Sequence, residues 1–315
     1  MSKLLDATWL ADDMLRVERL MLEVAGSSSN DLVGEAASHL LKAGGKRLRP
    51  ALVLLSSRVG TSGNTSTDLA AAAIELVHVA TLYHDDVIDE TETRRGAPTV
   101  HSKWGLEVAV LSGDYLFAKG CGLGADAGGE VPAILARAIA EVCEGQIMET
   151  TNLDDPRRTV DSYIETIRLK TAALFRAACE LGASTSSSTD GGRAALTAYG
   201  ENLGLAFQVV DDLIDLTGDP GVTGKEPGTD LREGVFTLPV LVAAERDPDV
   251  ADALANGVRE LDELLGPIER SGALDAAHDH ARALCDAALA ALEPLEDEDW
   301  VAVLRDIPAG VLAQA

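Results

Sequence analysis

Hydrophobic residues recur every three or four positions along most of this chain, in runs that polar loops interrupt. In the first run, over residues 4–24, Leu10, Met14 and Val17 follow this spacing with charged residues between them. The pattern places apolar side chains on one helix face and predicts an amphipathic α-helix. The segment GSSSND (26–31) then supplies polar N-cap residues for the next helix.

The same spacing predicts helices along the rest of the chain, and no segment shows the alternation expected of a β-strand. One helix ends near Lys42, one begins after Pro50, and one begins at Asp68. Further helices are expected over residues 105–123, 131–151, 160–182, 192–217, 235–245, 249–265 and 272–292. The expected fold class is all-α, a single bundle of ten or more helices in one domain over residues 1–315.

Composition and charge narrow the function classes. Apolar residues make up 46% of the chain and aromatic residues only 3%, so Ala, Leu and Val must fill most of the core. The formal net charge of −26 argues against a nucleic-acid surface, because phosphate backbones bind clusters of Lys and Arg. No apolar run reaches the roughly 20 residues that span a bilayer, and no signal-like segment opens the sequence. We therefore expect a cytosolic protein.

The four cysteines are widely spaced and lie in apolar segments. None of the spacings among Cys121, Cys143, Cys179 and Cys285 is typical of a metal site. They are expected to be reduced residues of the core.

Two acidic segments carry the candidate chemistry. In LYHDDVIDETETRRG (82–96), Asp85 and Asp89 share one helix face and Asp86 lies beside them, where like charges repel. A solvated helix face would explain one such segment. However, FQVVDDLID (207–215) repeats the pattern, and both segments follow apolar runs typical of buried helices. We infer that cations hold the carboxylates in place.

The donor types point to magnesium and a phosphate. Carboxylate oxygens without His or Cys favour Mg²⁺, which takes one or two carboxylates and completes its shell with water and substrate phosphates. Arg94 and Arg95 could bind phosphate oxygens through their guanidinium forks. In GGKRLRP (44–50), Lys46 and Arg49 lie at a glycine-rich helix start that also favours an anion, although an ordinary basic turn has the same composition.

Six segments follow one another along the chain in a fixed order: GGKRLRP, LYHDDVIDETETRRG, EGQIMET, LKTAALF, FQVVDDLID and GKEPGTDLREG. With them, the chain from about Gly44 to Pro239 resembles the trans-prenyltransferases, also called polyprenyl diphosphate synthases. The resemblance implies the isoprenoid synthase fold, an all-α bundle around a central elongation cavity. It also implies a Mg²⁺-dependent reaction in which an allylic diphosphate loses pyrophosphate, isopentenyl diphosphate attacks the carbocation head to tail (1′–4), and a proton is lost.

The resemblance assigns roles at the matching positions. Three Mg²⁺ ions are expected with the bound diphosphate, and their direct ligands are Asp85, Asp89 and Asp211. Three further carboxylates act directly or through water, namely Asp86, Asp212 and Asp215. The allylic diphosphate is expected at Arg94, Lys170 and Lys225, and the isopentenyl diphosphate at Lys46, Arg49, His78 and Arg95. The reacting centre is lined by Thr171 and Gln208.

Two positions refine this assignment. His78 lies seven residues before Asp85 on the same helix face, which favours a role in the site over the core role that a lone histidine usually has. Val235, in REGVFTLP, stands where many family members carry a lysine. One diphosphate contact is therefore expected to be missing.

Product length is expected to depend on Ala80 and Thr81, which lie about one turn before Asp85. Family members that stop early carry aromatic side chains there. The small side chains of this chain imply a medium- to long-chain product for a quinone side chain, with geranylgeranyl diphosphate as the alternative.

Other classes of protein fit less well. A class I terpene cyclase shares the first acidic motif but not the aspartates of the second, and a plain acidic scaffold does not explain six segments in order. A non-catalytic subunit of a heteromeric synthase would usually have lost aspartates that this chain keeps. The resemblance implies a homodimer, and the apolar segment over residues 106–123 is the candidate interface.

Overall fold

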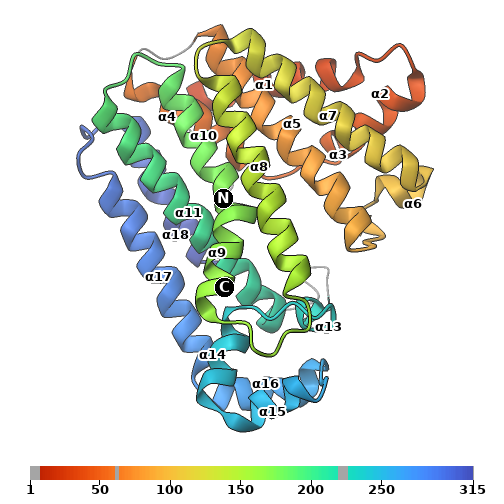
Figure 1. Cartoon of the computed structure of the whole chain (residues 1–315). Helices are drawn as coiled ribbons and strands as arrows, with labels where there is room; N and C mark the ends of the chain where they lie inside the picture. The colour runs from red at the N-terminus through yellow and green to blue at the C-terminus, as the bar shows by residue number, and fades with distance from the viewer. Residues whose placement is uncertain (1–7, 61–63, 219–225, 315) are drawn as a thin grey trace. The chain divides into compact units, whose positions relative to one another are not determined.

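The computed structural model describes residues 8–60, 64–218 and 226–314 and consists almost entirely of helices (Figure 1). The predicted all-α class, with ten or more helices, is confirmed. One element departs from it, a hairpin of two very short strands, β1 (Thr93–Arg94) and β2 (Ala97–Pro98). Among the described residues, no helix is long and apolar enough to cross a membrane.

The chain divides into two compact units. Unit 1 comprises Met1–Ile139 and Ala177–Thr197, and unit 2 comprises Ala140–Arg176 and Ala198–Ala315. Three helices contribute residues to both units: α8 (Val131–Thr151), α10 (Ala173–Ser184) and α11 (Asp190–Thr217). A single domain over residues 1–315 stays a prediction.

Unit 1 is built around two long helices, α5 (Thr65–Ile88) and α7 (Leu106–Ala127), which lie side by side in Figure 1. Glycines of α7 allow this close approach. A Cβ at Gly113 would lie 2.3 Å from the ring of His84, and one at Gly120 would lie 3.1 Å from the carbonyl oxygen of Ala73. The remaining elements of this part are α1 (Thr8–Gly26), α2 (Asp31–Ala37), α3 (His39–Lys42), α4 (Leu48–Ser56), η2 (Ser57–Val59) and α6 (Val100–Trp104).

Helix starts in unit 1 follow their capping residues. Asn30, within the predicted capping segment, accepts the Leu32 N–H at the start of α2. The side chain of Asn64 caps α5, so this helix begins three residues before the predicted Asp68. Helix α4 begins at Leu48 rather than after Pro50, because a proline fits in the first turn, where its missing N–H has no partner to lose.

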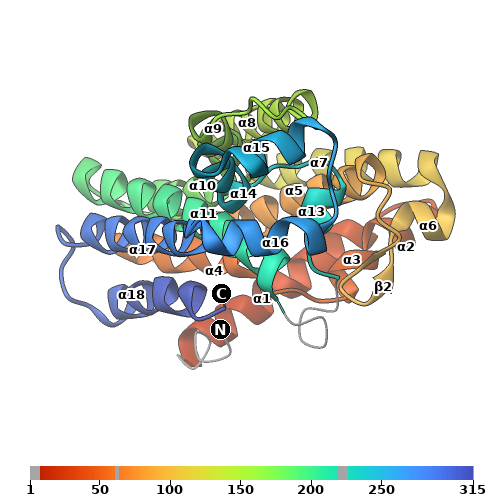
Figure 2. The ribbon, with the colours of Figure 1, turned by 90° about the horizontal axis from the view of Figure 1, so that it is seen from below.

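Unit 2 contains α9 (Val160–Ile167), the π-helical turn η3 (Arg168–Ala172) and α13 (Thr229–Arg232). Four further helices follow, α14 (Leu238–Arg246), α15 (Pro248–Ala255), α16 (Leu261–Arg270) and α17 (Ala273–Ala291). The last is α18 (Asp299–Leu312), which lies beside α17 in Figure 2.

The helical stretch predicted over 160–182 is confirmed as an unbroken helical run of α9, η3 and α10, although the π-helical turn within it was not predicted. Two other expectations in this part need correction. The predicted helix over 249–265 is two helices, separated at Gly257, whose positive φ of +83° ends the first. Helix α18 is not predicted, since Pro308 and the polar segment before it obscure its buried face.

The cysteine prediction is half right. All four thiols are free, and Cys179 and Cys285 are buried as expected. Burial raises the pKa of Cys179 to about 12, which keeps its thiol protonated. Cys121 on α7 and Cys143 on α8 are exposed, because they lie on the outer faces of these helices.

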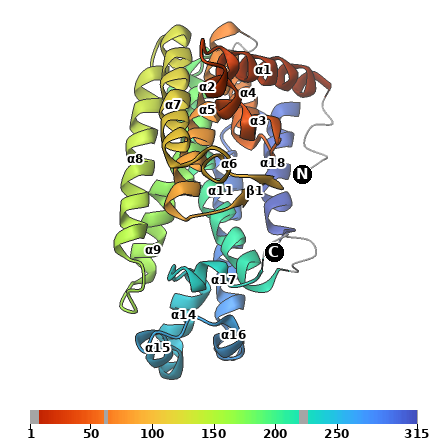
Figure 3. The ribbon, with the colours of Figure 1, turned by 90° about the vertical axis from the view of Figure 1, so that its right-hand side faces the viewer.

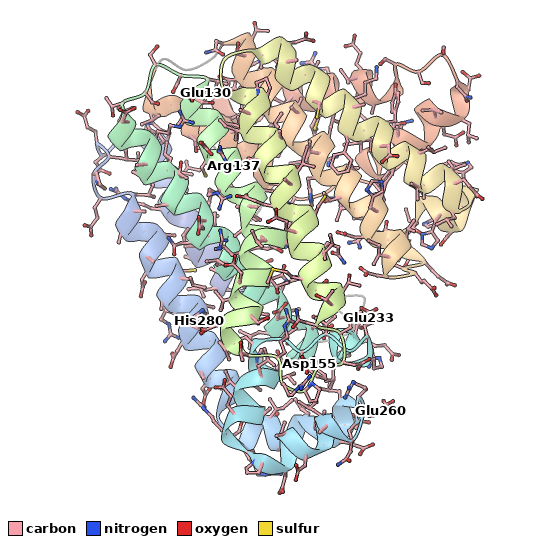
Figure 4. The ribbon with its side chains drawn as sticks, in the orientation of Figure 1. Glu130, Arg137, Asp155, Glu233, Glu260 and His280 are labelled. Atoms are coloured by element: carbon pink, nitrogen blue, oxygen red, sulfur yellow. The ribbon has the colours of Figure 1, made fainter. Side chains whose placement is uncertain are left out.

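A charged network joins three helix segments of unit 1. Arg193 of α11 forms ion pairs with Glu130, just before α8, and with Glu180 of α10. Arg137 of α8 pairs with the same Glu180 at 2.6 Å; Glu130 and Arg137 are labelled in Figure 4. The shared carboxylate connects the helices without burying an unpaired charge.

Candidate active site

The first acidic segment occupies the last turn of α5. Asp85 is half-buried, Asp89 is exposed, and Asp86 is 1% exposed. Arg94 Nε donates to Asp86 Oδ1, whereas Asp86 Oδ2 is buried and has no hydrogen-bond partner among the described residues. Burial raises the pKa of Asp86, and the positive charge of Arg94 opposes this shift.

The arginine that meets Asp86 is carried by the β1–β2 hairpin, which connects α5 to α6 (Figure 3). Thr93 pairs with Pro98 and Arg94 with Ala97, so only Arg95 and Gly96 form the turn. Both have positive φ, +54° and +73°, as a two-residue type I′ turn requires. Arg94 contacts Asp86, and Arg95 contacts the backbone carbonyl of Gly44.

The glycine-rich turn before α4 is shaped to receive Arg95. Gly44 and Gly45 have φ of +89° and +146°, and a Cβ at Gly45 would lie 2.7 Å from the Arg95 guanidinium. Arg47 follows in the left-handed region, with φ +48°, and is the N-cap residue of α4. Lys46 is exposed and Arg49 half-buried on either side of it. Unit 1 therefore brings the basic segment and the end of the first acidic segment together.

His78 lies within this cationic group. Burial lowers its pKa well below the ordinary value, and the positive charges of Arg49, Arg95, Arg94 and Arg47 lower it further. Its imidazole is therefore neutral at physiological pH and can donate one hydrogen bond without adding charge.

The second acidic segment, at the end of α11 in unit 2, is held by a chain of hydrogen bonds. Thr171 Oγ1 donates to Gln208 Oε1 at 2.7 Å, and Gln208 Nε2 donates to Asp212 Oδ1 at 2.8 Å. The hydroxyl of Tyr163 donates to Asp212 Oδ2. Both oxygens of this buried carboxylate are thus engaged, whereas Asp211 beside it is exposed.

The π-helical turn η3 places Lys170 and Thr171 in this unit. Lys170 forms an ion pair with Glu149 of α8. A Cβ at Gly145 would lie 2.4 Å from the backbone nitrogen of Lys170, and one at Gly204 would lie 2.6 Å from Ala172 Cα. Glycines on α8 and α11 thus let both helices approach the turn closely. Turns of this type are rare and occur frequently at functional sites.

Three residues of this cluster were missed by the sequence prediction. Asp230 donates its backbone N–H to Asp215 Oδ2 at 3.2 Å, and burial raises its pKa well above the ordinary value. Tyr163 contacts Asp212, and Glu149 contacts Lys170. Two of the three lie in segments that carry the resemblance, EGQIMET and GKEPGTDLREG, which is the signal that could have identified them.

The carboxylates of this unit crowd one another. Burial raises the pKa of Asp212 to about 7, and the negative charges of Asp211 and Glu149 add to this shift. The hydrogen bonds from Tyr163 and Gln208 oppose it. A cation near these groups would relieve the repulsion.

Four further positions were singled out in the sequence, namely Lys225, Ala80, Thr81 and Val235. Lys225 lies outside the described residues. Ala80 and Thr81 are buried in α5, and Thr81 Oγ1 donates to the carbonyl of His78 at 2.8 Å. The N–H of Val235 donates to the carbonyl oxygen of Asp230. The roles assigned to all these residues stay predictions.

The donor chemistry fits magnesium. Both acidic segments offer carboxylate oxygens, the ligands that Mg²⁺ prefers, and Asp86 Oδ2 is a buried oxygen with no partner in the described ranges. Within those ranges, no group of three or more His, Cys, Asp or Glu side chains could hold a metal ion by itself. Mg²⁺ bound together with phosphates needs only one or two carboxylates.

Carboxylates that suit Mg²⁺, together with Arg and Lys side chains that suit phosphate oxygens, are the groups expected of an enzyme that acts on a diphosphate. The chain belongs to the polyprenyl synthetase family, whose model matches residues 30–264. The resemblance to trans-prenyltransferases and the prediction of a prenyltransferase enzyme are confirmed.

Two curated relatives illustrate the similarity. The chain is 39% identical over 308 residues to a heptaprenyl diphosphate synthase component 2 of Geobacillus stearothermophilus, with 95% of each chain covered. It is 42% identical over 246 residues to a nonaprenyl diphosphate synthase of Mycobacterium tuberculosis, covering 77% of this chain and 73% of the relative.

Solved structures agree on the fold. A decaprenyl diphosphate synthase from Rhodobacter capsulatus superposes with a TM-score of 0.92 at 38% identity, covering 99% of this chain and 98% of the other. A polyprenyl synthase from Caulobacter crescentus, solved with calcium and isoprenyl diphosphate, has a TM-score of 0.90 at 37% identity, covering 96% and 95%. The predicted isoprenoid synthase fold is confirmed.

Tyr163→Phe tests how much the hydrogen bond from the Tyr163 hydroxyl to Asp212 stabilises the protein. Without the hydroxyl, a buried carboxylate oxygen loses its donor, which should lower the free energy of unfolding by about 1–3 kcal/mol. Urea denaturation measures this. Tyr199→Phe is the matched control, because its buried hydroxyl donates to the neutral carbonyl of Leu304 and its loss should cost about 0.5–1.5 kcal/mol. Unchanged stability of Tyr163→Phe would contradict the role assigned to its hydroxyl.

Proposed function

We propose that this chain is a catalytically active polyprenyl diphosphate synthase that condenses isopentenyl diphosphate with an allylic diphosphate and releases pyrophosphate. The observation that carries the proposal is that both aspartate motifs are complete and differently held. Buried Asp86 and Asp212 are fixed by Arg94, Tyr163 and Gln208, while Asp89 and Asp211 are exposed.

Carboxylates that reach solvent suit direct contact with metal, and Asp85 is half-buried whereas Asp89 and Asp211 are exposed. We infer that Asp85, Asp89 and Asp211 are direct Mg²⁺ ligands and that three ions bind with the diphosphate. Asp86, Asp212 and Asp215 then act mainly through water or by orienting neighbours, since the oxygens of Asp212 already accept protein hydrogen bonds. Bound Mg²⁺ would neutralise the charge that develops on the departing diphosphate.

The basic residues divide between the two substrates. Arg94, Lys170 and Lys225 are assigned to the allylic diphosphate, and Lys46, Arg49, His78 and Arg95 to isopentenyl diphosphate. Because His78 is neutral, it contributes a hydrogen bond rather than charge. Thr171 and Gln208 line the reacting centre, where the surrounding apolar side chains must keep water from the carbocation.

A medium- to long-chain product is favoured. Both curated relatives described above make long products according to their names, heptaprenyl and nonaprenyl diphosphate. Neither Ala80 nor Thr81 presents an aromatic ring to a growing chain. A quinone side chain is the proposed destination, and a cytosolic location is proposed with it. Geranylgeranyl diphosphate is the alternative product.

A homodimer is proposed, with α7 at its interface. Leu106, Val110 and Leu111 on this helix are exposed apolar side chains, and Leu111 is 65% exposed. Removing such a group of residues from water would stabilise an association of two copies.

One relative is described as a synthase component, which supports a second candidate. The chain could be one subunit of a heteromeric synthase. In that case it would be inactive alone and active when its partner is added.

A product assay tests the proposed reaction. The purified chain with Mg²⁺, labelled isopentenyl diphosphate and allylic primers of five to twenty carbons should incorporate label into products longer than twenty carbons. Asp85→Ala and Asp211→Ala should each lower the rate by about 100-fold or more, because each removes charge stabilisation made in the transition state. Chromatography of the dephosphorylated products gives both rate and length.

The control for this assay is Asp262→Ala, which removes an exposed aspartate of α16 and should leave the rate unchanged. No incorporation by the wild-type chain with any primer would refute the single-chain synthase and leave the heteromeric subunit to be tested.

Thr81→Phe tests the proposed chain-length position. A phenyl ring one turn before Asp85 should block elongation, so the main product should shorten to about twenty carbons or fewer, as the resemblance implies for aromatic residues there. Thr81→Ser, which keeps the hydroxyl that donates to His78, should keep the wild-type length. An unchanged length distribution for Thr81→Phe would place the floor of the pocket elsewhere.

Leu111→Glu tests the interface on α7. A charge at the centre of a buried dimer contact should dissociate the dimer, and sedimentation velocity should report half the wild-type mass. Leu15→Glu on α1 introduces the same charge at a residue 54% exposed and should leave the mass unchanged. A dimer that survives Leu111→Glu would exclude this part of α7.

A further inference from the structure

One buried acid in unit 1 has no part in the chemistry described so far. Glu75 lies in the middle of α5, in the apolar run AAAAIELVHVA, and is only 2% exposed. A buried carboxylate is costly unless an ion pair and hydrogen bonds compensate it. Its partner should therefore reveal why this helix carries it.

The partner is Arg47 of the glycine-rich turn. Arg47 Nη1 donates to Glu75 Oε1 at 2.9 Å, and Arg47 Nη2 donates to the carbonyl of Leu41 at 2.7 Å. Arg47 is 8% exposed and has the left-handed φ of +48°, a conformation that costs free energy for a residue with a side chain. The ion pair with Glu75 therefore anchors Arg47, whose left-handed backbone sets the direction of the turn.

Glu75 also acts on the arginines beyond the one it touches. Burial lowers the pKa of Arg49 to about 10 and lowers that of Arg95, and in both cases the negative charge of Glu75 opposes the shift. Arg95 and Arg49 in turn repel each other. One carboxylate therefore offsets part of the mutual repulsion of three guanidinium groups.

We propose that Glu75 is a positioning residue for isopentenyl diphosphate, which through Arg47 holds the turn bearing Lys46 and Arg49 in its binding geometry before the substrate arrives. The proposal rests on the function proposed above, because it assumes that these cations bind that substrate. A cluster of cations held together in advance binds a diphosphate without first having to overcome its own repulsion.

The simplest competing explanation is that the pair only stabilises the core. Breaking a buried ion pair lowers stability whatever else it does. The two explanations differ in selectivity. A core role would lower the amount of folded enzyme, and with it the maximal rate, and would leave both KM values unchanged, whereas a positioning role raises the KM for isopentenyl diphosphate and spares that for the allylic diphosphate.

Glu75→Gln in the full chain separates these explanations. Glutamine keeps the shape and one acceptor for Arg47 but removes the charge. The KM for isopentenyl diphosphate should rise by about tenfold or more, a factor that corresponds to about 1.4 kcal/mol. The KM for farnesyl diphosphate should stay within about twofold. Equal changes in both constants, or no change in either, would overturn the proposal.

Two further variants test whether the effect is specific to the ion pair between Glu75 and Arg47. Glu18→Gln removes an exposed carboxylate that lies 3.5 Å from Nε of the same arginine, and it should leave both constants unchanged. Arg47→Lys keeps the charge but loses the two-pronged contact with Glu75 and Leu41, and it should reproduce the selective rise if Glu75→Gln folds poorly. Circular dichroism and thermal unfolding establish that each variant is folded.

A binding measurement makes the result independent of turnover. Calorimetric titration of the protein with isopentenyl diphosphate alone should show affinity weakened by about tenfold in Glu75→Gln, the loss expected from KM. A wild-type chain that binds isopentenyl diphosphate but does not elongate it would refute the proposed synthase activity and still allow this comparison. Equal affinity of wild type and Glu75→Gln would refute the role of Glu75.

Discussion

Repulsion between charges of the same sign is the constraint on which both halves of this molecule depend. Each unit gathers carboxylates or guanidinium groups more densely than a solvated surface requires, and each buries some of them. Burying a charge without a partner would cost several kcal/mol, a large part of the roughly 5–15 kcal/mol of net stability that proteins have. The short hairpin supplies Arg94 to Asp86, and the π-helical turn supplies Lys170 to Glu149.

The two units solve this problem with different chemistry. In unit 1, Arg94 neutralises Asp86, and the single carboxylate of Glu75 offsets part of the repulsion among three arginines. In unit 2, the donors are neutral side chains. Tyr163 and Gln208 donate hydrogen bonds to Asp212 without cancelling its charge. Burial and crowding raise the pKa of Asp212 to about 7 and that of Asp230 well above its ordinary value, so a bound cation would favour the ionised carboxylates. This suits a part of the protein whose proposed task is to bind metal cations.

Periodicity predicted most of the helices but not their interruptions. Helix α8 has the predicted bounds of 131 and 151, because a regular apolar stripe is a local property of the chain. The π-helical turn at Arg168–Ala172 is not local, since its place depends on how closely Gly145 and Gly204 let two other helices approach. Likewise, the aspartates of both motifs could be identified from their spacing. Tyr163 and Glu75 could not, because what distinguishes them is a contact with a residue far away in sequence, Asp212 and Arg47.

The type I′ turn at Arg95 and Gly96 limits how this segment can evolve. Surface loops usually tolerate insertions and deletions. Here, two arginines adjacent in sequence serve two different anchors, Asp86 and the carbonyl of Gly44, and the strand pairing fixes which one faces which. Adding or removing one residue would exchange the faces of the strand and misdirect both guanidinium groups at once. This two-residue turn is therefore expected to have very little freedom to change its length.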